Sequence, residues 1–292
     1  MHMKRPQGNF ILPAFAVAGL LVVMLMITGC TSTPGGNVTT TPGGITTLKV
    51  TGSTTVLPLA QKAADTYMAD HKDANILITG GGSSVGVQAA GEGTADIGMS
   101  SRDVTSEEQA KYPALVKREI AWDAIVIIVN QANTVNQLSL PQARGIYNGT
   151  YTNWNQVGGQ DQVIVVVGRD SASGTRTYFS ETIMRNENFT RFQEEFNSNG
   201  GVQQKVSQTR GAVGYVGLGF TDGVRKLDIV VNGTPVEATI DTVKARTYPV
   251  SRPLYLLTRG EPTGLAQQYI DFILSPQGRQ IVETEGFISL SG

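Results

Sequence analysis

The chain has 292 residues, enough for one large or two ordinary globular domains. Its 23 Lys and Arg nearly balance 24 Asp and Glu, and this excludes the concentrated basic surface of a typical nucleic-acid-binding protein. A single cysteine excludes an internal disulfide framework, and two histidines, His2 and His71, exclude a multi-histidine metal site. We therefore expect no nucleic-acid partner, no metal and no cofactor.

The amino terminus has the order of features of a secretory signal. Basic residues precede an apolar run from Phe10 to Ile27, and small residues then lead to Cys30. Ile27-Thr28-Gly29-Cys30 resembles a lipobox, in which the signal peptide, here residues 1–29, is removed and the cysteine carries the lipid. An uncleaved anchor is the alternative, since the apolar run is almost long enough to span a bilayer. We favour lipidation at Cys30, and both interpretations place the domain outside the cytoplasmic membrane.

A segment rich in Thr, Pro and Gly follows the cysteine. Residues 30–46 contain hardly an apolar side chain, so they cannot bury enough surface to fold. We interpret them as a flexible tether between the lipid and a domain that begins at residue 47.

From residue 48 onward, β-rich and helical patterns alternate along the chain, which predicts an α/β fold with parallel sheets covered by helices. Asn232-Gly233 between two apolar runs predicts a hairpin turn. The expected strands are 48–51, 75–79, 97–99, 120–130, 163–167, 213–216, 227–231 and 254–258. The expected helices are 56–67, 85–92, 140–147, 174–184, 189–196, 202–208, 263–274 and 276–283.

Three loops share a composition of Gly, Ser and Thr and a place between a strand and a helix: Gly52–Thr55, Gly80–Ser84 and Ser171–Thr175. Ligands bind at the carboxyl ends of strands in open α/β sheets. Helix amino termini there offer unpaired N–H groups and the positive end of the dipole, which bind anions without much formal charge. Any one of these loops could simply be a helix cap. The three together predict an anion site.

Two further features add donors to this set. The segment Ala95–Arg102 places Ser100, Ser101 and a cation after a strand. Arg169 precedes the third loop, and its planar guanidinium suits a phosphate-like array of oxygens. The alternative for Arg169 is an ion pair with a nearby aspartate, Asp170 or Asp161.

At this point the chain resembles a known family. Four segments, in chain order, are similar to the signature segments of PstS, the substrate-binding proteins of phosphate ABC importers, and two later segments are similar as well. The resemblance extends from about residue 48 to the carboxyl terminus. The segments are Gly52–Val56, Gly82–Gly86, Ala95–Arg102, Arg169–Arg176, Gly211–Gly217 and Tyr248–Leu254.

The resemblance implies a fold and a division of the chain. The fold is α/β, a two-lobed type II periplasmic-binding-protein-like architecture in which each lobe is a mainly parallel sheet flanked by helices. The chain crosses between the lobes twice, near 123–130 and 246–254. Residues 47–125 and 250–292 form lobe I, and residues 126–249 form lobe II.

The resemblance also implies site residues, carried over position by position. Thr54 and the backbone N–H of Thr55 donate to phosphate from one lobe together with Ser83. Some relatives have an aspartate that accepts the phosphate proton, and the corresponding residue here is Ser101, whose hydroxyl both donates and accepts. The contacts expected from the other lobe come from Arg169, Ser173, Gly174 and Thr175.

We therefore expect an extracytoplasmic, lipid-anchored and monomeric binding protein that captures inorganic phosphate and delivers it to the membrane permease of an ABC importer, without enzymatic activity. A binder of another oxyanion such as sulfate, or a phosphate sensor, is the closer alternative. A secreted phosphatase-like enzyme is more distant, because Ser/His/Asp chemistry would have to use His71, which we expect at the surface.

Overall fold

The computed structural model describes residues 44–290. The expected signal peptide, Cys30 and most of the expected tether lie outside these residues. The first strand, β1 (Thr46–Gly52), pairs with β2 (Ala74–Thr79) from Thr46 onward, opposite Ala74. The tether expected to run to residue 46 therefore ends before Thr46, because that residue is already hydrogen-bonded into the sheet.

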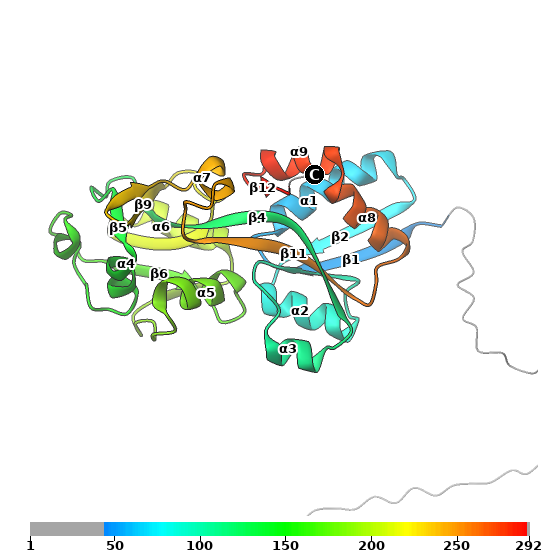
Figure 1. The fold of residues 1–292 in the computed structure, drawn as a ribbon, viewed down its shortest axis with the longest axis horizontal. Coiled ribbons are helices and arrows are strands. Elements are labelled where there is room, and N and C mark those ends of the chain that lie inside the picture. The colour runs from blue at the N-terminus through cyan, green and yellow to red at the C-terminus, as the bar shows by residue number, and fades with distance from the viewer. Residues whose placement is uncertain (1–43, 291–292) are drawn as a thin grey trace, which may run out of the picture. The chain divides into compact units, whose positions relative to one another are not determined.

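Strands and helices alternate over most of the described chain (Figure 1). The other strands are β3 Ile97–Ser100, β4 Leu115–Val129, β5 Gln137–Ser139, β6 Val165–Arg169, β7 Glu194–Phe196, β8 Ala212–Gly217, β9 Arg225–Val231, β10 Thr234–Val236, β11 Ser251–Arg259 and β12 Ile288–Ser289. The α-helices are α1 Leu57–Asp70, α2 Ser83–Glu92, α3 Ser106–Lys111, α4 Leu140–Tyr147, α5 Gly174–Phe179, α6 Asn199–Gln208, α7 Ile240–Lys244, α8 Gly264–Leu274 and α9 Pro276–Thr284. A 3₁₀ turn (Trp154–Val157) and a π-helical turn (Ser180–Met184) complete the set.

Most elements expected from the sequence are confirmed within one to five residues at their ends. The hairpin is confirmed as well: β9 and β10 pair antiparallel, and Asn232 and Gly233 between them have φ of 49° and 82°. A two-residue turn with positive φ at both positions matches the twist of the strands it joins.

The helix expected over 189–196 is wrong. Phe189, Phe192 and Phe196 are spaced like a helical stripe, but Phe196 ends β7, which pairs in parallel with β6. Phe192 is 75% exposed and therefore does not share a buried face with the other two rings. Tertiary pairing with β6 overrides the local periodicity.

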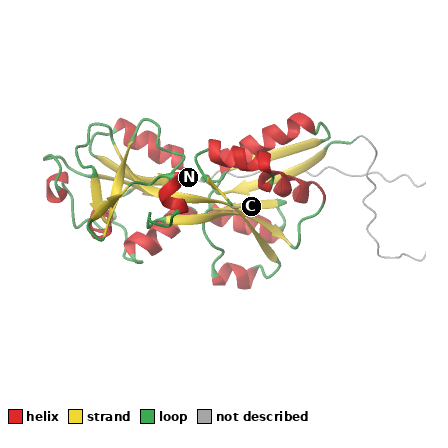
Figure 2. Cartoon of the chain, turned by 45° about the horizontal axis from the view of Figure 1, so that its top comes forward, coloured by secondary structure: helices red, strands yellow, loops and turns green. Residues whose placement is uncertain are grey.

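The strands follow the order β2-β1-β3-β11-β4-β8-β6-β7 in the described chain. Parallel pairing joins β2, β1 and β3 in one part and β8, β6 and β7 in the other. Antiparallel pairing involves β4, β11, β12 and the β9–β10 hairpin. Two groups of parallel strands, each flanked by helices, are the arrangement of a two-lobed α/β fold. Figure 2 shows helices on both sides of the strands.

Two strands connect the lobes, as Figure 1 shows for β4 and β11. The first part of β4 pairs with β11, and Ile125–Val129 at its end pairs with β8 of the second lobe. The chain returns beside it, where Ile125 N–H donates to the carbonyl of Val250 at 2.9 Å, just before β11. Nine of the ten residues from Ile120 to Val129 are buried, since this strand is covered on both faces. The two crossovers expected from the sequence are present.

Each lobe has a hydrophobic core of its own. In the first lobe the stripe of α1, including Leu59, Ala63 and Tyr67, packs on Val50 and Ile97 of the sheet. In the second lobe an aromatic cluster of Tyr147, Phe179 and Tyr215 joins α4, α5 and β8, and Val202 and Val206 of α6 belong to the same core. Burial of each large apolar side chain stabilises the folded state by roughly 1.5 to 3 kcal/mol relative to leaving it exposed. The exact division at 47–125 with 250–292 and at 126–249 stays a prediction; Ile288 of β12 belongs to the second core.

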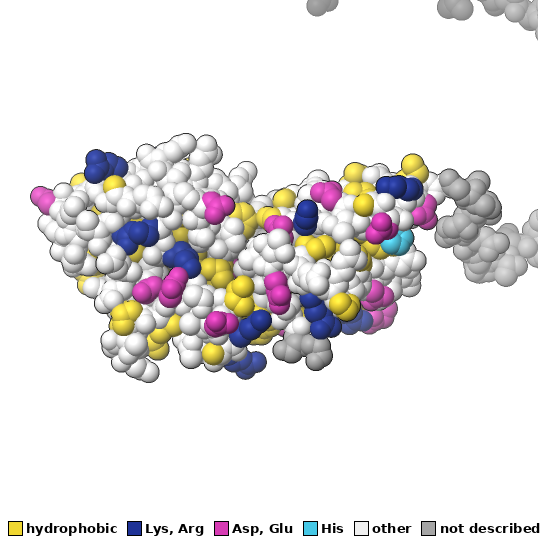
Figure 3. Space-filling model, turned by 90° about the horizontal axis from the view of Figure 1, so that it is seen from above, with side chains coloured by type: hydrophobic (Ala, Val, Ile, Leu, Met, Phe, Trp, Pro, Cys, Tyr) yellow, Lys and Arg dark blue, Asp and Glu magenta, His cyan; other side chains and the backbone are white. Residues whose placement is uncertain are grey.

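The surface carries both signs of charge. Figure 3 shows Lys and Arg side chains interspersed with Asp and Glu over one face of the molecule. Between residues 44 and 290, none of the helices combines the length and the apolar character needed to span a membrane.

Candidate functional site

The three Gly, Ser and Thr-rich loops lie where the sequence predicted, each between a strand and the following helix. Two of them, one from each lobe, touch: Ser84 N–H donates to the carbonyl of Ala172 at 3.1 Å. Gly82 makes this approach possible, because it has φ of 94° and a Cβ there would lie 2.5 Å from the same carbonyl oxygen. The first loop joins them through Thr55 Oγ1, which lies 3.2 Å from Thr175 Oγ1, so all three loops meet at the junction of the lobes.

One of the serines acts as a helix cap: Ser173 Oγ accepts from Arg176 N–H at 3.2 Å, at the start of α5. Ser53 Oγ accepts from Thr55 N–H at 3.2 Å in the turn before α1, whose N-cap is Val56 and has no side-chain cap. The N–H of Thr55 that the sequence assigned to phosphate is thus shared with Ser53 in this structure.

Ser83 has a different environment from Ser53 and Ser173. Its hydroxyl accepts from Ser101 N–H at 3.0 Å and lies 3.2 Å from Ser101 Oγ, and both side chains are buried. Gly174 of the second lobe packs on this pair, since a Cβ there would lie 2.2 Å from Ser83 Oγ. The structure thus brings together three expected site residues, Ser83, Ser101 and Gly174.

Arg169 is 1% exposed and reaches from the second lobe to the first. Its Nη2 donates to Thr54 Oγ1 at 3.1 Å, and Nε donates to the carbonyl of Phe196 at 3.1 Å. In the described chain its Nη1 has no hydrogen-bond partner, and its ion pairing with Asp170 or Asp161 is not observed. Burial lowers the pKa of Arg169 to about 10, still well above neutral pH, so the guanidinium remains charged.

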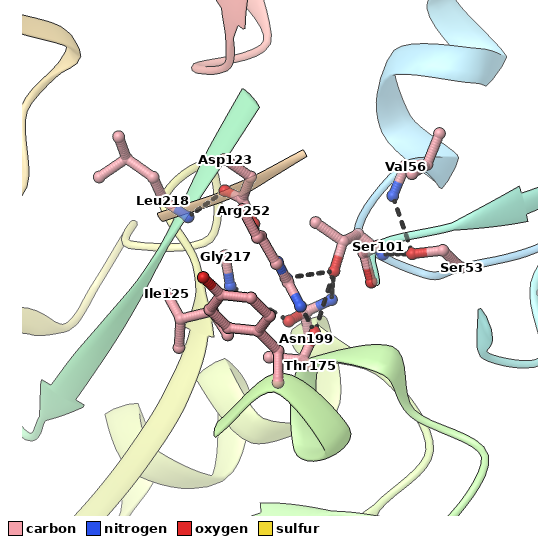
Figure 4. Close-up of polar contacts among 12 residues, drawn as sticks. Ser53, Val56, Ser101, Asp123, Ile125, Thr175, Asn199, Gly217, Leu218 and Arg252 are labelled. Carbon is pink, nitrogen blue, oxygen red and sulfur yellow. Dashed lines mark hydrogen bonds and ion pairs between the residues drawn. The ribbon is translucent and has the colours of Figure 1, made fainter. Parts of the chain in front are cut away.

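A second buried guanidinium, which the sequence did not single out, lies on the crossovers. Arg252 of β11 and Asp123 of β4 are both fully buried and form an ion pair of 2.9 Å between Nη2 and Oδ2. The same Nη2 lies 3.2 Å from Thr55 Oγ1 and 3.0 Å from Thr175 Oγ1, one hydroxyl from each lobe. Figure 4 shows Arg252 extending from Asp123 toward Thr175. Burial raises the pKa of Asp123 and lowers that of Arg252, and the ion pair opposes both shifts.

Asn199 is a third residue that the sequence did not indicate. It is fully buried at the start of α6, and its Nδ2 donates to Thr55 Oγ1 at 3.0 Å. Its Oδ1 accepts from Gly217 N–H at 3.3 Å, which fixes the amide orientation. An isolated carboxylate inside the apolar run of β4 was the available signal for Asp123, whereas nothing in the local sequence distinguishes Asn199 from an ordinary cap.

The remaining charged candidates have structural roles. Asp96 accepts from Lys49 N–H at 2.7 Å and joins two strands of the first lobe. Arg102 forms a bidentate pair with Glu108, with both contacts at 2.7 Å. Arg102 Nη2 also donates to Ser84 Oγ at 3.0 Å, so Arg102 supports one of the three loops from behind.

The chemistry of this junction is that of anion binding. The buried charged groups here are two guanidiniums and one carboxylate: Asp123 pairs with Arg252, and the positive charge of Arg169 is left without an ionic partner among the described residues. Hydroxyls and helix-start N–H groups surround them, and such donors suit an oxyanion. His71 lies at the opposite end of α1, and a 14-residue helix spans about 20 Å, so it cannot serve a nucleophile in these loops. Residues 44–290 contain no cluster of three or more His, Cys, Asp or Glu side chains that could hold a metal ion.

Comparison with known proteins identifies the class. A family model described as a PBP superfamily domain matches residues 37–277. The phosphate-binding protein PstS of Bacillus subtilis is 30% identical over 243 residues, which cover 83% of this chain and 80% of the relative. PstS of Borreliella burgdorferi is 29% identical over 82% of this chain and 88% of its own. The chain belongs to the PBP superfamily and, within it, to the PstS family of phosphate-binding proteins.

Solved structures agree with this assignment. A candidate phosphate ABC transporter substrate-binding protein from Clostridium perfringens, determined with bound phosphate, has a TM-score of 0.80 and 36% identity, covering 84% of this chain and 100% of that one. An ABC-type phosphate transport receptor from Vibrio cholerae has a TM-score of 0.68 and 32% identity, over 83% of this chain and 100% of that one. Both names describe binding components of transporters rather than enzymes.

Proposed function

We propose that this protein captures inorganic phosphate between its two lobes and delivers it to the permease of an ABC importer. The observation that carries the proposal is the convergence of buried donors from both lobes, with Arg169 of one lobe bonded to Thr54 of the other. The family membership and the phosphate-bound relative from Clostridium perfringens support the choice of ligand.

The proposed phosphate ligands follow the expectation from the sequence. Phosphate sheds its water on entering, so nearly every oxygen lone pair needs a protein donor. We assign this role in the first lobe to Thr54, Thr55, Ser83 and Ser101, and in the second lobe to Arg169, Ser173, Gly174 and Thr175. Because Thr55 N–H already faces Ser53 Oγ at 3.2 Å, a phosphate oxygen has to compete for that donor.

Donors on both lobes also give a mechanism of capture. A phosphate held by both sides binds the closed arrangement better than an open one, and so shifts the population toward closure. The crossovers β4 and β11 are the segments about which the lobes would move. A permease that recognises the closed arrangement would accept the loaded protein and not the free one.

Location, anchoring and assembly form part of the proposal. The lipobox-like segment before Cys30 supports cleavage, lipid attachment and retention at the extracytoplasmic face of the membrane. We propose a monomer and no enzymatic activity, since His71 is remote from the loops and the relatives are named as binding proteins.

Sulfate is the second candidate ligand, and one observation favours it. Ser101, where some relatives have a proton-accepting aspartate, is a buried hydroxyl paired with Ser83. A hydroxyl can accept a hydrogen bond from the phosphate O–H, but it does not repel a fully deprotonated oxyanion as a carboxylate does. Selectivity for phosphate over sulfate is therefore the property that most needs measurement.

Calorimetry on the purified protein, freed of phosphate by an enzymatic scavenging system, tests the proposal. We expect phosphate to bind with micromolar or tighter affinity and sulfate to compete more weakly. Absence of heat together with failure to retain labelled phosphate would contradict the proposal. Incubation with a chromogenic phosphate ester is the control for the enzyme class, and turnover above the rate of a heat-denatured sample would contradict a pure binding function.

A further inference from the structure

The Arg252 side chain contacts one threonine hydroxyl from each lobe, and this fixes the direction of their hydrogen bonds. A guanidinium can only donate, and so can the Nδ2 of an asparagine. Thr55 Oγ1 receives Arg252 Nη2 at 3.2 Å and Asn199 Nδ2 at 3.0 Å, which occupies both of its lone pairs. The Thr55 hydroxyl must therefore donate its own proton.

The nearest acceptor for that proton is Thr175 Oγ1, 3.2 Å away. Thr175 Oγ1 also receives Arg252 Nη2 at 3.0 Å, so its two lone pairs are occupied as well. The Thr175 hydroxyl then has a proton to give and no capacity to accept. Since Thr175 is 1% exposed, water does not readily take this proton.

Asp123 keeps Arg252 in this position. It accepts from both Nε, at 3.2 Å, and Nη2, at 2.9 Å, and its other oxygen accepts from Leu218 N–H at 3.0 Å. Nη2 has two N–H bonds for three acceptors, so one hydrogen is shared between two oxygens. Both members of the pair lie on the crossover strands β4 and β11, and the pair therefore remains beside the site while the lobes move.

We propose that Arg252, held by Asp123, is a positioning residue that acts on Thr175 directly and through Thr55, and so makes the Thr175 hydroxyl an obligate donor toward the bound oxyanion. This inference rests on the proposed function, because it deepens the account of the same site. It distinguishes Arg252 from Arg169: Arg169 is assigned to the anion itself, whereas Arg252 acts through the threonine hydroxyls.

A double-mutant cycle between the ion pair and Thr175 tests the proposal. The pair is replaced as Asp123→Asn with Arg252→Met, because removing one partner alone would leave a buried charge unpaired and could prevent folding. Thr175→Val removes the hydroxyl and retains the shape. Phosphate affinity is measured by calorimetry for the wild type, each replacement and the combination, and thermal unfolding confirms that every variant folds.

We expect the pair replacement alone to weaken phosphate binding by about tenfold or more, as for loss of a charge-assisted hydrogen bond. In the Thr175→Val background the same replacement should cost about twofold or less, because the hydroxyl it orients is gone. Arg252→Lys, which keeps a cationic donor, should bind phosphate more tightly than the pair replacement. Arg144→Gln is the matched control: this second-lobe arginine donates to the carbonyl of Ile183 and makes no contact with the site, so affinity should not change.

If the pair replacement weakens phosphate binding equally in the wild type and in Thr175→Val, the proposed role of Arg252 is wrong. The proposal also requires the combined variant to bind phosphate about as well as Thr175→Val, so loss of binding in the combined variant would overturn it. A lysine variant no better than the pair replacement would also count against it. These outcomes differ from failure of the proposed function, in which the wild type itself does not bind phosphate.

Discussion

The α-carbon of Gly174, in the second lobe, packs directly against the hydroxyl of Ser83, in the first. A Cβ atom on Gly174 would lie 2.2 Å from Ser83 Oγ and 3.0 Å from Ser101 Oγ. Because Ser83 is fully buried and already accepts from Ser101 N–H, it has little freedom to move aside. The closeness of the two lobes at this point therefore depends on the absence of a side chain.

We expect Gly174→Ala to weaken phosphate binding by about ten- to a hundredfold, the effect of roughly 1 to 3 kcal/mol of overpacking on closure. Calorimetry on the folded variant measures the change. The control is Gly200→Ala in α6, where a Cβ meets nothing within 4 Å. That change should leave affinity unaltered and stabilise the fold by about 0.5 to 1 kcal/mol. Unaltered affinity in Gly174→Ala would show that the lobes tolerate a wider separation.

Arg169→Ala is expected to weaken phosphate binding by about ten- to a hundredfold, which corresponds to roughly 1.5 to 3 kcal/mol for a hydrogen bond to a charged group. The guanidinium is buried, charged and in contact with Thr54 of the other lobe. Titration calorimetry checks this, with Arg191→Ala as control, since Arg191 is an exposed arginine of the same lobe that lies over Phe192. Equal affinities for the two variants would remove Arg169 from the site.

Ser101→Asp is expected to raise the preference for phosphate over sulfate. A carboxylate beside Ser83 accepts the proton of monohydrogen phosphate but repels sulfate, which has none to give. Competition between the two anions gives the ratio of affinities. Ser101→Asn is the control, because asparagine has nearly the shape of aspartate without its charge, and it should leave the ratio of affinities close to that of the wild type. If aspartate lowers the ratio or leaves it unchanged, the phosphate proton lies elsewhere in the site.

The three Gly, Ser and Thr-rich loops could be predicted because the residues that define each loop are neighbours in the sequence. Gly52–Thr55, Gly80–Ser84 and Ser171–Thr175 each combine a strand end, a helix start and small polar residues within a few positions. A helix start leaves backbone N–H groups without intrahelical partners, so such a turn offers donors to an anion in any α/β sheet. Their meeting at one junction required the topology, which only the family resemblance supplied.

The charged framework behind those loops could not be predicted in the same way. Asp123 and Arg252 are 129 residues apart in sequence, and their pairing depends on the antiparallel register of β4 and β11. Asn199 is also remote, 144 residues from Thr55. The error at 189–196 has the same origin, since pairing of β7 with β6 determines that segment and not the spacing of its phenylalanines.

We expect Glu108, which is not one of the proposed phosphate-binding residues, to make a pH-dependent contribution to the free energy of unfolding. Burial opposes its ionisation, but hydrogen bonds from Arg102 and from Thr105 N–H outweigh that effect and lower the pKa of Glu108. The folded state therefore binds the proton less readily than the unfolded state. The resulting stabilisation is fully present above the ordinary glutamate pKa of about 4.3 and is lost as the pH falls through the lower folded value.

Glu108→Gln should accordingly lower the free energy of unfolding by about 1 to 3 kcal/mol at neutral pH, because Arg102 is 5% exposed and loses its ionic partner. Glutamine still completes the cap with Thr105, so the change reports the charge. Urea unfolding at pH 7 and at about pH 3 measures the difference, which should shrink at the lower pH. Glu261→Gln, at an exposed pair with Arg118, should cost at most about 1 kcal/mol at pH 7. A Glu108→Gln deficit that stays constant from pH 7 to the acid limit would place its origin in packing and not in ionisation.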